Sequence, residues 1–108
     1  MYSQLAVGVD QVVKVAVASP LPEQIFSKGE FVELNFSLNR IQGFGGRYHA
    51  YIVPPNNQPV IQIVEESSLA SLHGHQIFKR FETVGEYELF VEAHSPLGGA
   101  IHQKFIIQ

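Results

Sequence analysis

The chain has 108 residues, of which 45% are hydrophobic and 16% charged, and its formal net charge is −3. This length allows one hydrophobic core, the composition is too apolar for a disordered chain, and no apolar run approaches the ~20 residues that span a bilayer. The small negative charge, with no basic stripe, argues against nucleic-acid binding, and the absence of cysteine excludes disulfides, thiolate metal sites and a cysteine nucleophile.

The first half of the chain contains one strongly alternating segment. Residues 1–10 are expected to form a flexible arm, and residues 11–108 a single domain that opens with the β-rich run "VVKVAVA" at 12–18. The segment "FVELNFSL" at 31–38 then places apolar and polar residues at strictly alternating positions. A period of two predicts a strand with one buried and one solvated face, so the inward set here is Val32, Leu34, Phe36 and Leu38.

Five more β-rich runs follow, at 47–53, 60–64, 75–81, 86–93 and 100–107, separated by turn signals such as "QGFGG", "PPNNQP" and "SPLGG". In the run at 86–93 the alternation turns Tyr87, Leu89, Val91 and Ala93 inward and leaves Phe90 with the outward glutamates. The segment "EESSLASLHG" at 65–74 has room for a single helical turn. About seven short strands without a convincing helix predict an all-β protein, an antiparallel β-sandwich.

Two segments resemble immunoglobulin-like domains. "FETVGEYELFVEA" at 81–93 looks like the approach to strand F, where a Gly turn precedes a Tyr and an apolar residue follows two places later. "VASPLPEQIFSKGEFVELNF" is similar to the opening of extracellular bacterial immunoglobulin-like and PKD-like modules. The resemblance implies structural roles for Gly85, Tyr87 and Leu89, with the Tyr87 hydroxyl tied to upstream backbone. The cysteine pair and the strand C tryptophan of antibody domains are absent.

Five histidines suggest a metal-binding alternative, because neutral imidazole is the commonest metal ligand. If residues 95–99 form the last hairpin loop, His94 pairs with Ala100 and Glu92 faces His102. Strand C lies beside strand F in an immunoglobulin-like sandwich, so His49 is placed near them. The candidate copper or zinc site is therefore His49, Glu92, His94 and His102; His73 and His75 are expected in the other sheet. The principal interpretation has no cofactor.

Aromatic residues predicted to be exposed suggest a contact surface. These are Phe44 in the Gly-rich loop, Tyr48 or Tyr51 on strand C, and Phe90 on the outer side of strand F. Exposed aromatic clusters commonly mark contacts with protein or sugar. The expected partner is another protein or a neighbouring domain, with carbohydrate as an alternative.

Enzymatic interpretations lack a supporting motif. None of the serines lies in a "GxSxG" turn, Asp10 is the only aspartate, and Glu65 and Glu66 are adjacent on a strand and point to opposite faces. The sequence thus predicts a non-catalytic binding or structural module of a periplasmic, secreted or cell-surface protein, without nucleic-acid binding or membrane insertion. A metal-binding sandwich and a carbohydrate-binding accessory domain are the two alternatives.

Overall fold

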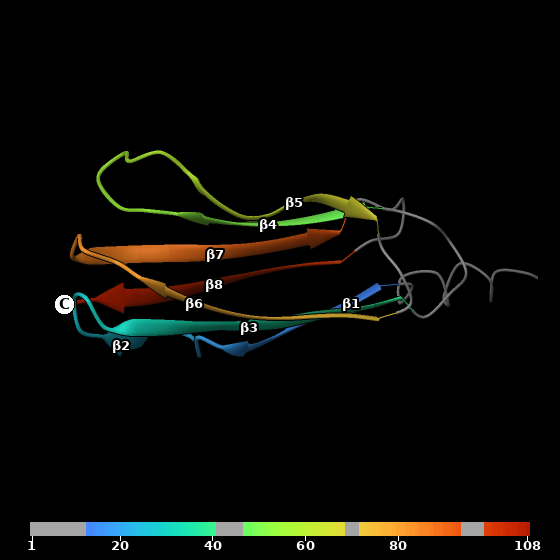
Figure 1. The fold of residues 1–108 in the computed structure, drawn as a ribbon, viewed down its shortest axis with the longest axis horizontal. Helices are drawn as coiled ribbons and strands as arrows, with labels where there is room; N and C mark the ends of the chain where they lie inside the picture. The colour runs from blue at the N-terminus through green and yellow to red at the C-terminus, as the bar shows by residue number, and fades with distance from the viewer. Residues whose placement is uncertain (1–12, 41–46, 69–71, 94–98) are drawn as a thin grey trace, which may run out of the picture.

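The computed structural model describes residues 13–40, 47–68, 72–93 and 99–108, which form eight strands (Figure 1). The predicted arm at residues 1–10 lies outside the described residues. The strands are β1 (Val13–Ser19), β2 (Gln24–Phe26), β3 (Phe31–Arg40), β4 (Arg47–Val53), β5 (Ile61–Ser68), β6 (Leu72–Arg80), β7 (Gly85–Ala93) and β8 (Ala100–Ile107).

The strands form two sheets that pack face to face. One sheet has three strands in the order β1-β3-β6, and the other has five in the order β2-β8-β7-β4-β5. Every pair is antiparallel except the short parallel pair of β2 and β8. The protein is therefore an immunoglobulin-like antiparallel β-sandwich, which confirms the predicted fold class.

β2 is the strand that the sequence pattern does not predict, and it lies where the chain crosses from one sheet to the other. After β1 the Pro-rich segment crosses over, held by a hydrogen bond from the Ser19 hydroxyl to the Glu33 carbonyl (2.8 Å) and one from the Gln103 amide to the Pro20 carbonyl (2.6 Å). β2 then pairs with β8 over only three residues. Three residues are too few to show a period of two, so the sequence pattern does not predict this strand.

The core lies between the sheets and follows the alternation of the strands. The positions expected to point inward on β3 and the first three of those on β7 are buried, and Ala93 packs partly buried against them. The buried hydrophobic residues are Val32, Leu34, Phe36, Leu38, Tyr48, Ala50, Ile52, Phe81, Tyr87, Leu89, Val91, Phe105 and Ile107. The outward positions of β7, including Phe90, are more exposed.

The turn before β7 has the features that the resemblance implies. Gly85 has φ of +143°, a conformation that side chains disfavour, and an added Cβ would lie 2.8 Å from Cγ of Pro55. Two residues later the Tyr87 hydroxyl donates a hydrogen bond to the carbonyl of Thr83 at 2.6 Å. Leu89 is completely buried. These three residues therefore fix the start of β7 against the core.

The predicted helical turn at 65–74 is wrong for the residues that the structure describes. β5 continues to Ser68 because Ser67 and Ser68 pair with Tyr48 and Arg47, and β6 already begins at Leu72. Residues 69–71 lie outside the described residues. Strand pairing, which involves residues distant in sequence, thus overrides the weak local helical signal.

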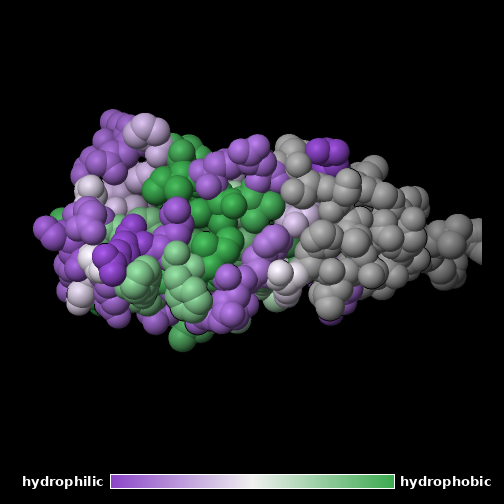
Figure 2. All heavy atoms as spheres, viewed as in Figure 1, coloured by the Kyte–Doolittle hydropathy of each residue, from purple (hydrophilic) through white to green (hydrophobic). Residues whose placement is uncertain are grey.

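Along one side of the sandwich, residues at the margin of the core are partly exposed. Ile61 and Ile63 of β5 and Ile77 of β6 pack against the core but are only partly buried. Figure 2 shows an apolar strip between more hydrophilic areas, over the part of the molecule where Figure 1 draws β4, β7 and β6. This strip belongs to the core margin and is distinct from the outer faces of the sheets.

Candidate functional site

The outer face of the five-stranded sheet carries a row of rings across three neighbouring strands. Tyr51 of β4 pairs with Phe90 of β7, and Phe90 pairs with His102 of β8. The rings of Tyr51 and Phe90 stack with centroids 4.9 Å apart and an interplanar angle of 4°, and the Phe90 and His102 centroids are 4.1 Å apart. His49 meets Tyr51 edge to face at 5.2 Å. We call these four residues the outer aromatic row.

Alternation explains why these side chains share one face. On β4, His49 and Tyr51 alternate with Tyr48, Ala50 and Ile52, which are buried. Side chains two apart on a strand point to the same side, and cross-strand neighbours lie about 5 Å apart. The inward packing of β4 therefore sets the outward positions from which the row is built.

The stacking has a chemical consequence for what the row can bind. Centroids 4.9 Å apart with parallel planes mean that Tyr51 and Phe90 cover each other's faces. His49 and His102 contact the two rings from the flanking positions. The row therefore presents mainly ring edges to solvent, and a broad open ring face on which a sugar could stack is not its main feature.

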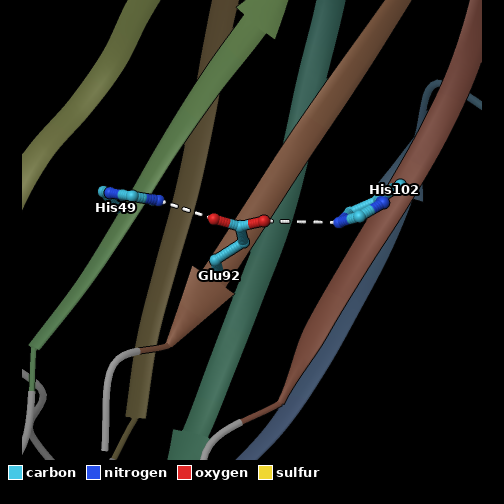
Figure 3. A network of polar contacts seen from close by, with 3 residues as sticks. All are labelled: His49, Glu92 and His102. Atoms are coloured by element: carbon cyan, nitrogen blue, oxygen red, sulfur yellow. Dashed lines mark hydrogen bonds and ion pairs between the residues drawn. The ribbon is translucent and has the colours of Figure 1, made fainter.

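Glu92 joins the two histidines of the row. Nε2 of His49 lies 2.8 Å from one carboxylate oxygen of Glu92, and Nε2 of His102 lies 3.3 Å from the other (Figure 3). An ionised carboxylate only accepts hydrogen bonds, so both rings donate from Nε2. The bond from His49, followed by that from His102, holds the pKa of Glu92 below its ordinary value, although partial burial acts in the opposite direction.

Carboxylates also affect the tyrosine of the row. Burial, and then the negative charges of Glu92 and Glu88, raise the pKa of Tyr51 above its ordinary value. The Tyr51 hydroxyl therefore stays protonated near neutral pH and is available as a hydrogen-bond donor. The face as a whole combines aromatic edges with the outward carboxylates of β7, which are Glu86, Glu88 and Glu92.

The predicted register of the last hairpin is wrong by two residues. Glu92 pairs with Ala100, and His102 lies opposite Phe90 rather than opposite Glu92. This register places Tyr87 opposite Phe105, where the two rings stack at 5.3 Å inside the core. A two-residue shift leaves every side chain on its own face, so His102 still reaches Glu92 from the diagonal position.

The structure brings three of the four proposed metal ligands together and leaves one untested. His49, Glu92 and His102 are in contact, whereas His94 lies outside the described residues. Within the described ranges no group of three or more histidine, aspartate or glutamate side chains has the geometry to hold a metal ion. The carboxylate lies between the two imidazoles, so the three side chains do not converge on one point.

Two of the four predicted contact residues lie on the expected face. Tyr51 and Phe90 are in the outer aromatic row, and Phe44 lies outside the described residues. Tyr48 is wrong as a contact residue, because it is only 2% exposed and shares its side of β4 with Ala50 and Ile52. The sequence analysis left Tyr48 and Tyr51 open, and the alternation of β4 decides for Tyr51.

The core contains a polar pair that the sequence analysis missed. The hydroxyl of Tyr48 and Nε2 of His75 are hydrogen-bonded at 2.8 Å, and the His75 ring stacks on Phe36 at 5.1 Å. β6 belongs to the three-stranded sheet, as expected, so His75 reaches Tyr48 across the sandwich and stays apart from the outer aromatic row. A pairing between two sheets leaves no local sequence signal.

The comparisons with known proteins identify the fold. No protein-family model matches the sequence, and no curated protein sequence is significantly similar to it. A part of a beta-glucosidase from Listeria innocua superposes with a TM-score of 0.54 at 11% identity, covering 86% of this chain and 16% of that one. A mutant of this enzyme in complex with laminaribiose gives a TM-score of 0.53 at 13% identity, with the same coverage.

A second kind of similar structure is a PKD domain of an M14-like peptidase from a Thermoplasmatales archaeon. It covers 87% of this chain and 92% of that one, with a TM-score of 0.44 and 12% identity. The chain spans about one-sixth of the length of the glucosidase that it matches. The similarity to this part of the glucosidase shows a shared fold alone and carries no statement about substrates.

Proposed function

We propose that this domain is a non-catalytic binding or structural module, which contacts a partner protein or a neighbouring domain through the outer aromatic row. The observation that supports the proposal best is the arrangement of Tyr51, Phe90 and His102 as contiguous rings on a solvated sheet face. Half-buried aromatic rings beside hydrogen-bonding groups are enriched in protein interfaces. Tyr51 and Phe90 would serve as apolar anchors, and Glu92 would fix the two histidines around them.

An extracytoplasmic setting is part of this proposal. It is supported by the resemblance of the opening segment to extracellular modules. In the part of the chain that the structure describes, no helix is long and apolar enough to cross a membrane.

Site-specific photo-crosslinking in cells that produce the protein tests the contact. A photoreactive phenylalanine replaces either His102, the member of the row on β8, or Gln58, in the exposed loop between β4 and β5. We expect a discrete adduct from position 102 that is absent from position 58 and is lost when Tyr51→Ala is added. Equal labelling at both positions, or an adduct insensitive to Tyr51→Ala, would contradict the proposal.

Carbohydrate binding is the weaker alternative for the same face. Sugar rings commonly stack on open aromatic faces, whereas Tyr51 and Phe90 cover each other here. A glycan panel tests the alternative directly. Binding of any glycan that is abolished by Phe90→Ala would replace the protein contact by a sugar contact as the function of the row.

Metal binding is the second candidate, favoured by one observation, the contact of both histidines with Glu92. In tetrahedral coordination a metal about 2 Å from an imidazole nitrogen and a carboxylate oxygen holds these two atoms ~3.3 Å apart. The gap from His102 to Glu92 is 3.3 Å and that from His49 to Glu92 is 2.8 Å, so the second pair would have to separate by roughly 0.5 Å. Titration with Zn(II) or Cu(II), followed by amide NMR at pH 7.5 and 5.5, tests this. Shifts confined to His49, Glu92 and His102, and lost at the lower pH, would support the metal site.

A further inference from the structure

The outer face of the three-stranded sheet carries a second aromatic surface. Phe31 of β3 and Phe78 of β6 are 57% and 56% exposed, far more than large apolar side chains inside the sandwich. The guanidinium carbon of Arg80 lies 4.2 Å from the centroid of the Phe31 ring. Phe31 pairs with Arg80, and Phe78 pairs with Glu33 on the same face. We call Phe31, Phe78 and Arg80 the Phe31–Arg80 cluster.

The two outer faces have complementary charge. The described outward side chains of the three-stranded sheet include two cations, Lys14 and Arg80, and one carboxylate, Glu33. On the five-stranded sheet, β7 presents three outward carboxylates, Glu86, Glu88 and Glu92, next to the outer aromatic row, while β4 and β8 present two outward cations, Arg47 and Lys104. Lys104 lies 3.8 Å from Glu86, so Glu88 and Glu92 are the carboxylates of β7 without a lysine partner among the described residues. A small excess of cations on one aromatic face thus corresponds to a small excess of carboxylates on the other.

The middle of the outer face of the three-stranded sheet has small side chains, which allow another surface to approach closely. The residues there are Ala16, Ser37 and Gly74, which pair with one another across the three strands. An added Cβ at Gly74 would meet no atom within 4 Å. Small side chains in this row leave the Phe31–Arg80 cluster as the projecting feature, whose aromatic rings could rest against those of another sheet.

Two of the four sheet edges are poorly suited to association. The edge strand β6 turns Lys79 toward the inside of the sandwich, opposite buried Val32. The pairing of the edge strand β5 with β4 has two register shifts. Inward charges and bulges hinder the addition of a further strand at an edge. Edge-to-edge pairing is therefore disfavoured at β5 and β6.

We propose that the partner of the outer aromatic row is a second copy of this domain, which docks through its Phe31–Arg80 cluster. The inference rests on the proposed binding role of that row. Arg80 would bring its guanidinium to the carboxylates of β7, while Phe31 and Phe78 cover the exposed edges of Tyr51 and Phe90. Because the two faces differ, a docked pair leaves one outer aromatic row and one Phe31–Arg80 cluster unoccupied. The arrangement is therefore head to tail.

The size of the face predicts weak association. Three strands of about nine residues each cover roughly 400 Å², so two such faces bury roughly 800 Å² in total. Interfaces of this size are transient, and they are suited to copies held close together in a longer chain or assembly. Electrostatic attraction between the faces should weaken as salt is added.

Analytical ultracentrifugation of the domain up to about 1 mM is the first measurement, since weak complexes form at micromolar concentrations and above. We expect a weight-average mass that rises with concentration without a plateau at the dimer, and that falls when NaCl is added. A wild-type domain that stays monomeric throughout would overturn the inference. The photo-crosslinking result at position 102 would still decide whether a different partner uses the row.

Two variants decide between head-to-tail and symmetric contacts. Arg80→Glu impairs the cluster and Phe90→Glu impairs the row. Each variant alone should be monomeric, whereas an equimolar mixture should form dimers, because each variant retains the face that the other lacks. Self-association of Arg80→Glu alone would indicate row-to-row contacts, self-association of Phe90→Glu alone would indicate cluster-to-cluster contacts, and either would overturn the inference.

The mixing experiment is valid only if both variants fold. Circular dichroism and thermal unfolding check each variant, and Arg80→Gln and Phe90→Ser replace any variant that does not fold. For these milder changes we expect Kd to increase at least about tenfold, as is typical when a central interface side chain is removed. A mixture of the two variants that remains monomeric would also contradict head-to-tail docking.

Discussion

The two faces of the five-stranded sheet carry aromatic clusters of similar geometry in opposite surroundings. On the inner face, Tyr87 stacks on Phe105 at 5.3 Å with an interplanar angle of 15°, and Phe81 contacts both rings. On the outer face, Tyr51 stacks on Phe90 at 4.9 Å with an angle of 4°. Ring geometry alone thus does not distinguish a structural cluster from a binding cluster. Burial distinguishes them, because the contribution of an aromatic side chain to the free energy of unfolding follows the area that folding removes from water.

The largest effect is expected from the inner cluster. Phe105→Ala removes a completely buried ring that contacts Phe26, Phe81 and Tyr87. We expect a loss of about 3–5 kcal/mol in the free energy of unfolding, from lost burial and the cavity left behind. Urea unfolding followed by circular dichroism measures it. A loss under about 1 kcal/mol would mean that the inner cluster does not hold the sheets together.

Gly85, in the turn before Tyr87, should be the next most sensitive position. Gly85→Ala places a Cβ 2.8 Å from Pro55 in a backbone conformation that side chains disfavour. We expect a destabilisation of about 1–3 kcal/mol from steric and backbone strain. Gly74→Ala is the matched control, because its Cβ meets nothing within 4 Å. Equal unfolding midpoints for the two variants would contradict this role of Gly85.

The inner face was largely predictable from the sequence, for a physical reason. Burial of one face imposes a period of two, so "FVELNFSL" and "EYELFVEA" reveal both the strands and their inward residues. Tyr48 could have been assigned from the same signal, since it shares its phase with Ala50 and Ile52. The three-residue strand β2 is too short for a period to appear.

The arrangement of the outer face was predictable only in part. Alternation places His49, Glu92 and His102 on one side of the sheet, but it cannot fix the register of the last hairpin. A two-residue shift preserves every inward and outward assignment, and the stacking of Tyr87 on Phe105 that accompanies the observed register is a contact across strands. The pair of Tyr48 and His75 joins two sheets and is equally invisible in local sequence.

On the outer face, loss of a ring should affect binding more than folding. Phe90→Ala removes contacts with Tyr51 and His102 but leaves no cavity in the core. We expect a destabilisation of about 0.5–1.5 kcal/mol, the contribution of aromatic pairs on a partly exposed face. Thermal unfolding compared with Phe105→Ala provides the measurement. Collapse of the fold would show that Phe90 belongs to the structural set.

The smallest expected effect is the pH dependence contributed by Glu92. Its pKa is lowered in the folded protein, chiefly by the hydrogen bond from His49, so the carboxylate stabilises the fold above the pKa it has in the unfolded chain. This contribution is lost as the pH falls through the folded pKa. The stability difference between wild type and Glu92→Gln should therefore be present above pH ~4.5, at up to about 1 kcal/mol, and shrink as the pH falls below that value.

Glu88→Gln is the control for this pH dependence, since it lies on the same face of β7 and no histidine hydrogen bond reaches it within the described residues. Urea unfolding between pH 3 and pH 7 compares the two variants. A pH-independent difference for Glu92→Gln would mean that the carboxylate acts through packing alone. A difference that fades in acid would show that the ionised carboxylate of Glu92 holds the two histidines of the outer aromatic row.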